Sequence, residues 1–238
     1  MPGLYKDEGV VLKTIKLGEA DRIVTIFTQY NGKVRAVAKG VRKTKSRFGG
    51  RLEPFTQVQL LIYRGRELDT ITGADIVAPF KGVRTDFGRV TAAAAIAELV
   101  EKIMPERERA LPVYDLLLGA LESVAQGAEN VVPAFLVKLL SLAGFHPQLS
   151  VCAGCGGAGG LEGFSPALGG VVCRKCWDED EGAWRIGSDR VALLSTLLTS
   201  EFGCVSDPAA TREVTDALRR YAEYHLERPL KSLQLLAI

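Results

Sequence analysis

The sequence predicts an α+β protein in which an N-terminal five-stranded OB-fold barrel precedes an α-helical domain with an inserted four-cysteine zinc ribbon. Apolar residues recur with a period of two as far as residue 77 and with a period of about 3.6 beyond residue 84. Two Cys-x2-Cys pairs interrupt the helical part. We therefore expect an OB-fold domain at residues 1–80 and a helical domain at residues 81–238, with the zinc ribbon at residues 150–180.

The N-terminal part predicts five short strands. Gly18-Glu19-Ala20 breaks the apolar pattern after the first strand, and Asn31-Gly32 is a strong signal for a two-residue hairpin after the second. The long connection between the third and fourth strands favours a barrel of the OB type, with an SH3-like barrel as the alternative. We expect a bend at Gly73, and strands at residues 9–17, 21–30, 33–39, 55–63 and 67–77.

Five amphipathic helices are expected after a linker at residues 79–84, and they should pack as one α domain. Pro105 ends the first helix, and Gly144 follows the third at a C′ position. Asp207-Pro208 supplies an N-cap residue and a proline at the first position of the last helix. The expected helices cover residues 85–104, 111–126, 132–143, 188–200 and 207–227.

The stretch from Lys33 to Arg51 carries eight basic residues and no acidic one. Its first part alternates basic and apolar residues, which predicts a strand with one cationic face, and its Gly-, Ser- and Thr-rich remainder predicts a mobile loop around Phe48. A cationic strand that leads into a cationic loop is typical of a surface that binds a polyanion. Lysines that only deter aggregation of an edge strand are the alternative, but that role does not require so many. The candidate nucleic-acid-binding residues are Lys33, Arg35, Lys39, Arg42, Lys43, Lys45, Arg47 and Arg51.

The net charge of +2 conceals an asymmetry between the two parts of the chain. Through Arg84 there are 16 basic and 8 acidic residues, whereas the remainder has 14 and 20, so a polyanionic partner is expected on the N-terminal part. The polar N-terminus lacks the apolar segment of a signal peptide, and no apolar run reaches about 18 residues. Five clustered cysteines do not suit a secreted disulfide framework. We expect a cytoplasmic protein without membrane contact.

The pairs Cys152/Cys155 and Cys173/Cys176 are separated by 17 residues, which is a strong signal for zinc. Four thiolates complete a tetrahedron and leave no position for water or substrate, so we expect one structural Zn²⁺ per chain. Paired disulfides are an alternative that a reducing compartment disfavours, and a redox role lacks its usual strand-to-helix context. Cys204 lies apart and is expected to be a small buried hydrophobe.

The sequence shows no phosphate-binding loop, dinucleotide-binding glycine fingerprint or nucleophile elbow. His146 and His225 are isolated, and we expect them to cap or pack helices. Phe48 and Tyr63 are candidates to stack on an unpaired base, although packing in the barrel is the favoured interpretation for Phe48. We expect a DNA-binding protein and not an enzyme. The alternatives are an interaction scaffold built on the helices, and a metal-dependent nuclease or RNA-modifying enzyme, against which the closed zinc site argues.

Four long segments occur in a distinctive order: GVVLKTIKLGEADRIVTIFTQYNGKVRAVAKGVRKTKS, RLEPFTQVQLLIYRG, FLVKLLSLAGFHPQLSVCAGCG and YHLERPLKSLQLL. This order resembles the family of the bacterial DNA repair protein RecO over nearly the whole chain. Residues 18–21 and 38–42 match the family's barrel pattern. Cys152, Cys155, Cys173 and Cys176 match the four-cysteine form of its zinc module, which some relatives lack.

The resemblance implies a recombination mediator of the RecF pathway. Such a protein binds single- and double-stranded DNA, anneals complementary strands, and associates with RecR and with single-strand-binding protein. Together with RecR it assists the loading of RecA onto coated single strands. These expectations place the protein in the cytoplasm in association with the nucleoid, with DNA, RecR and single-strand-binding protein as direct partners and RecA as an indirect one.

Overall fold

The computed structural model describes residues 3–204 and 207–235. The chain divides after Gln126 into two compact units, so the first two helices belong to the same unit as the barrel. The domain limits expected at residues 80 and 81 stay a prediction. No helix in the described ranges is both long and apolar enough to cross a bilayer.

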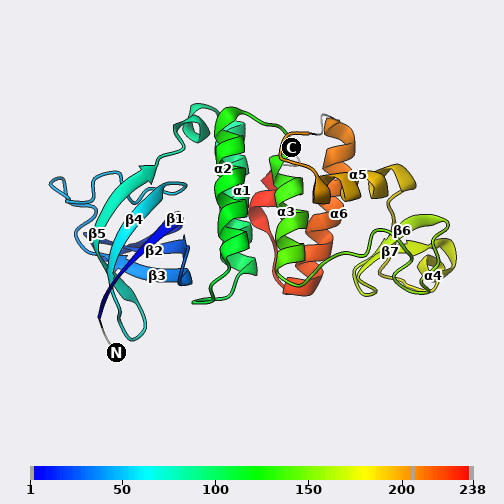
Figure 1. The fold of residues 1–238 in the computed structure, drawn as a ribbon, viewed down its shortest axis with the longest axis horizontal. Coiled ribbons are helices and arrows are strands. Elements are labelled where there is room, and N and C mark those ends of the chain that lie inside the picture. The colour runs from blue at the N-terminus through cyan, green and yellow to red at the C-terminus, as the bar shows by residue number, and fades with distance from the viewer. Residues whose placement is uncertain (1–2, 205–206, 236–238) are drawn as a thin grey trace. The chain divides into compact units, whose positions relative to one another are not determined.

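The first unit contains a closed five-stranded barrel of OB topology, drawn in blue and cyan in Figure 1. The strands follow the order β1-β2-β3-β5-β4, and the antiparallel neighbours are closed into a barrel by a short parallel pairing of β3 with β5. This confirms the predicted fold class. The strands are β1 (Leu4–Leu17), β2 (Asp21–Thr28), β3 (Gly32–Ala38), β4 (Gln57–Tyr63) and β5 (Asp69–Ala78).

The length of β1 explains how five strands close. Its residues 4–10 pair with β4 and its residues 9–17 pair with β2, with a bulge at Leu12 where the strand changes direction. A second bulge lies at Thr72, beside Gly73, where the sequence predicted a bend. The first strand begins five residues earlier than expected, because its polar start at Tyr5, Lys6 and Asp7 breaks the apolar pattern that sequence reasoning follows.

The connection between β2 and β3 is longer than the predicted two-residue hairpin. Thr28 pairs with Gly32, so three residues form the turn. Asp7 holds this turn through hydrogen bonds from the backbone N–H groups of Tyr30 and Asn31 and from the Asn31 amide. Gly32 has a φ of 61°, and a Cβ there would lie 1.9 Å from the Glu108 carbonyl oxygen, so only glycine fits.

Two helices complete the first unit: α1 (Phe87–Ile103) and α2 (Leu111–Gln126), preceded by the short 3-10 helix η1 (Lys81–Thr85). The fully buried Asp69 joins β5 to the connection between these helices. Its carboxylate accepts hydrogen bonds from the Tyr5 hydroxyl at 2.6 Å, from Arg107 at 3.0 Å and from the Gly65 N–H at 3.0 Å. Tyr114 of α2 donates to Glu8 of β1 at 3.2 Å. The barrel and its two helices therefore share buried polar contacts.

The second unit is built on α3 (Val131–Leu142), in which nine of twelve residues are buried. This helix packs against α5 (Ser188–Thr199) and α6 (Pro208–Leu226), and Asp207 caps α6 as predicted by accepting the Ala210 N–H at 3.1 Å. A small three-stranded sheet has the order β7-β6-β8; β6 and β7 lie between the two cysteine pairs in the chain, β8 follows the second pair, and Cys173 is the last residue of β7. Its elements are β6 (Leu161–Ser165), β7 (Gly170–Cys173) and β8 (Trp184–Arg185), with α4 (Arg174–Asp178) after β7; α7 (Lys231–Leu235) follows α6.

Candidate nucleic-acid interface and metal centre

The predicted alternation of β3 is confirmed by burial. Val34, Ala36 and Ala38 point into the barrel and are buried, whereas Arg35 and Lys39 are exposed on the outer face. The outward positions are therefore available for charge, and the inward ones build the core that makes the strand.

The two ends of this cationic face differ in what surrounds them. Lys33 is only partly exposed, and its ammonium donates to the Glu101 carbonyl oxygen at the end of α1. The Arg107 N–H donates to the Lys33 carbonyl at 2.9 Å. Arg35 lies 4.0 Å from the Glu106 carboxylate. Lys33 thus helps hold α1 on the barrel. The cationic face that is open to a ligand is therefore shorter at this end than the sequence predicted.

The loop after β3 holds five exposed cations: Lys39, Arg42, Lys43, Lys45 and Arg47. It is fixed to the turn between β1 and β2 by three hydrogen bonds. The Gly40 N–H donates to Asp21 at 2.7 Å, the Arg42 N–H donates to the Ala20 carbonyl at 2.9 Å, and the Arg42 guanidinium donates to the Gly18 carbonyl at 3.1 Å. The segments 18–21 and 38–42, which the sequence analysis singled out, are therefore in contact.

Phe48 anchors the middle of this loop. Its side chain is 1% exposed and belongs to the barrel core together with Leu52 from the same loop. The Arg47 guanidinium lies 4.9 Å from the Phe48 ring centroid, and Arg51 donates to the Arg47 carbonyl at 3.0 Å. The packing role favoured for Phe48 is confirmed, and its ring has no face available for a base. The loop is therefore held on the barrel by its apolar residues and presents its cations outward.

Lys13 is a further exposed cation that sequence reasoning missed. It lies in register with Thr25, which in turn lies opposite Arg35, so Lys13 and Arg35 share one row of the outer face. Glu101 lies 3.9 Å from the Lys13 ammonium. Lys13 could have been identified only from its pairing with Thr25. That pairing cannot be predicted from the sequence, because the bulge at Leu12 shifts the register of β1 against β2.

The four predicted metal ligands come together in the second unit. Their sulfur atoms all lie within 4.8 Å of one another, with Cys152 and Cys155 before β6, Cys173 at the end of β7 and Cys176 in α4. Gly154 lets the chain pass close to the cluster, because a Cβ there would lie 3.0 Å from the Cys176 sulfur and crowd it. A compact set of four thiols is the donor set that Zn²⁺ prefers in closed tetrahedral sites, so the residues fit the ion.

The electrostatics of the cluster also favour a cation. Burial opposes ionisation of Cys152, but backbone N–H groups of Cys173, Cys155 and Gly154 outweigh it and lower the pKa of Cys152 to about 6. The neighbouring cysteine sulfurs raise the pKa of Cys176 to about 12 through hydrogen bonds and repulsion. Four thiolates in so small a volume are stable only when a cation compensates their charge.

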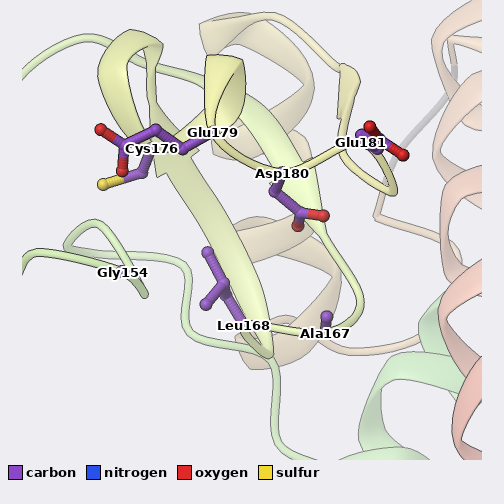
Figure 2. A pocket seen from close by; sticks show the side chains of 7 residues that line it. All are labelled: Gly154, Ala167, Leu168, Cys176, Glu179, Asp180 and Glu181. Atoms are coloured by element: carbon purple, nitrogen blue, oxygen red, sulfur yellow. The ribbon is translucent and has the colours of Figure 1, made fainter.

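A shallow hollow of about 440 Å³ lies beside the cluster. Figure 2 shows Gly154 and Leu168 on one side of it and Cys176, Glu179 and Asp180 on the other. Asp180 accepts hydrogen bonds from the Ser165 hydroxyl and, at 2.9 Å, from the Gly182 N–H. These contacts give Asp180 a role in holding the loop after α4.

The two isolated histidines pack or bond within the fold, whereas Tyr63, the last residue of β4, is 45% exposed. His146 lies 3.0 Å from the Ser141 hydroxyl near the end of α3, as expected of a residue at a helix end. His225 packs in α6 against Phe145, Tyr221 and Tyr224, and burial lowers its pKa although a hydrogen bond to the Pro166 carbonyl opposes the shift. Cys204 is exposed, so the expectation of a buried small hydrophobe was wrong. Cys204 lies in the segment that follows the end of α5 at Thr199.

Comparison with known proteins agrees with this architecture. Residues 1–80 match the family model for the recombination protein O N terminal, and residues 84–234 match that for the recombination protein O C terminal. The chain is 46% identical over 241 residues to a DNA repair protein RecO of Frankia casuarinae, with 98% of each chain covered. It is 44% identical to the RecO of a Nocardioides species over 97% of this chain and 98% of the relative, and 41% identical to that of Thermobifida fusca over 98% of both. The chain belongs to the RecO family of DNA repair proteins.

Proposed function

We propose that this protein is a DNA-binding recombination mediator of the RecF pathway. It binds single- and double-stranded DNA, anneals complementary strands, and acts with RecR to load RecA onto single strands coated by single-strand-binding protein. It works in the cytoplasm at the nucleoid and catalyses no covalent step. The observation that carries the proposal is the loop of five exposed cations, Lys39, Arg42, Lys43, Lys45 and Arg47, anchored at one end of the OB barrel of a chain in this family.

Annealing makes a simple physical demand on such a surface. Two polyanionic strands repel each other, and cations that contact phosphates reduce this repulsion without reading sequence. The loop meets the demand because Phe48 and Leu52 fix its backbone while its charged side chains project into solvent. Base edges then remain free to find their complements.

The zinc site has a structural role in this proposal. Cys152, Cys155, Cys173 and Cys176 would hold one Zn²⁺ per chain, which ties the segment before β6 to the end of β7 and to α4. Bound zinc supplies a rigid crosslink and no reactive water, because four thiolates occupy its coordination positions.

The charge reversal Lys39→Glu/Lys45→Glu tests the location of the DNA site. In the described structure neither lysine shows an ion-pair partner, so their replacement changes charge without removing a contact of the fold. We expect weaker binding to every DNA sequence, and a salt dependence of log K that is flatter by about two units of slope.

A matched control is Lys6→Glu/Arg66→Glu, which changes the net charge equally. Lys6 and Arg66 are exposed near the opposite end of the barrel, where β1 begins and β4 turns into β5. This variant should keep most of the affinity and the salt slope. Equal losses in both variants would show that net charge alone matters, and an unchanged slope in the loop variant would reject the proposed site.

A further inference from the structure

A row of aliphatic side chains crosses the outer face of the barrel. Ile15 of β1 lies opposite Ile23 of β2, and Ile23 lies opposite Val37 of β3. Residues in direct register on neighbouring strands have side chains about 5 Å apart and on the same face of the sheet. The residues next to this row along the strands, Val24 and Ala36, belong to the barrel core, so the row itself points outward.

The row is not needed to build the core, and it is open to solvent at one end. Ile15 is 45% exposed, and Ile23 and Val37 are partly exposed. Farther along β2 the same outer face is covered, because Thr25 and Phe27 are buried. The face is therefore open toward the turn between β1 and β2 and toward the basic loop, which we define as residues 39–47 after β3.

Cations border the aliphatic row on both sides. Lys13 and Arg35 occupy the adjacent row through Thr25, and Lys39 and Arg42 follow Val37 on the other side. Three acidic groups in the same area have partners: Asp21 accepts the Gly40 N–H, while Glu101 and Glu106 lie near Lys13 and Arg35 and offset part of their charge. Glu19 is exposed in the turn between β1 and β2, so the cations outnumber the acidic groups that face the row without a partner. An apolar strip between two lines of positive charge is complementary to a strand that has apolar base faces and anionic phosphates.

We propose that Ile15, Ile23 and Val37 form the surface on which the barrel holds the bases of an unpaired DNA strand, with the phosphates on the flanking cations. The inference rests on the proposed DNA-binding function and adds to it the distinction between single and double strands. In a duplex the base faces are stacked inside the helix and cannot reach the row. Phe48 is buried, and the exposed Tyr63 lies opposite Leu4 at the start of β1, away from the row. At the row itself, aliphatic contact therefore replaces the aromatic stacking that many single-strand-binding surfaces use.

The test uses the full-length triple variant Ile15→Thr/Ile23→Thr/Val37→Thr. Threonine keeps the β-branched shape that suits a strand while it removes apolar surface. The probes are a fluorescent oligo-dT and an abasic strand of the same length, which carries the same phosphates without bases. We expect the wild type to prefer oligo-dT by about tenfold, which corresponds to about 1.4 kcal/mol. The variant should bind both strands almost equally, with its affinity for the abasic strand and its salt slope unchanged.

Ile76→Thr/Val77→Thr is the matched control, because these two residues on β5 are each 48% exposed and lie outside the row. It should keep the preference for oligo-dT. The inference is overturned if the wild type shows no preference or if the triple variant retains it. If the triple variant also loses affinity for the abasic strand, the nearly isosteric single variant Val37→Thr is measured instead. A lower preference of that variant for oligo-dT supports the inference, and an unchanged preference overturns it. Failure of the proposed function looks different: neither probe would then bind in a salt-sensitive way, and the inference would fall with it.

Discussion

The candidate functional residues of the barrel lie outside its core, whereas those of the zinc module hold its segments together. In the barrel, twelve buried residues form one core cluster, and the exposed loop cations take no part in it. In the zinc module the four candidate ligands are themselves the residues that join its segments, and few apolar residues, among them Phe164, Val171 and Val172, are buried in its sheet. Exposed loop lysines such as Lys39 and Lys45 can therefore change without loss of structure, whereas the cysteines cannot.

The largest effect that follows from this difference is expected for Cys152→Ser. Cys152 is the buried member of the cluster, and a structural zinc site contributes its binding free energy to folding, on the order of 10 kcal/mol. The zinc content measured by metal analysis should fall from about one ion per chain to almost none. Amide hydrogen exchange in β6 and β7 should become much faster. DNA binding by the basic loop should persist, because that loop belongs to the other unit.

Cys204→Ser is the control for this experiment, since Cys204 is exposed and lies outside the cluster. Full zinc content and normal exchange are expected of it. Zinc retained by the Cys152 variant would contradict the four-thiolate site. Loss of DNA binding in that variant would mean that the zinc module contributes to the interface, and the contrast between the two regions would fail.

The same contrast explains what could be predicted from the sequence. The strands, the helix α2 (Leu111–Gln126) and the four cysteines were found because periodicity and motif spacing are local signals. The surroundings of Lys33 were not found, because they depend on where the end of α1 lies. The register of Ile15 with Ile23 was also hidden, since the bulge at Leu12 shifts every later pairing by one residue. Local chemistry is readable from the chain, and contacts between distant segments are not.

A smaller loss of stability is expected for Asp69→Asn, which should affect the first unit and leave zinc binding intact. The fully buried carboxylate accepts bonds from Tyr5, Arg107 and Gly65, and removal of its charge leaves the Arg107 guanidinium without its anion. We expect a loss of about 3 kcal/mol in the free energy of unfolding, measured by urea denaturation. Asp75→Asn is the control, because the Asp75 side chain is exposed and its ion pair with Arg51, at 3.9 Å, is long. This substitution should lower the free energy of unfolding by less than about 1 kcal/mol.

The pH dependence of the same network has a definite sign. Burial opposes ionisation of Asp69, but the hydrogen bonds from Arg107, Tyr5 and Gly65 outweigh it and hold the pKa of Asp69 below its usual value of 3.8. The stabilisation is therefore complete above that value and is lost as the pH falls through the lower pKa of the folded state. Wild type and Asp69→Asn should become more alike in stability in strong acid. A difference that stays constant down to pH 2 would contradict the assignment of the effect to this carboxylate.

The smallest effects separate Lys33, which lies on β3, from Lys39, the first residue after that strand. Lys33 donates to the Glu101 carbonyl and helps hold α1, so Lys33→Ala should lower the free energy of unfolding by about 1 kcal/mol and change DNA affinity little. Lys39 is exposed at the start of the loop, so Lys39→Ala should leave stability unchanged and flatten the salt dependence of DNA binding by about one unit of slope. Urea denaturation and salt titrations of both variants measure the two quantities. Lys33 and Lys39 lie at the two ends of β3, six positions apart. Equal effects on DNA binding would mean that the end of α1 does not limit the interface, which would then extend along the whole of β3.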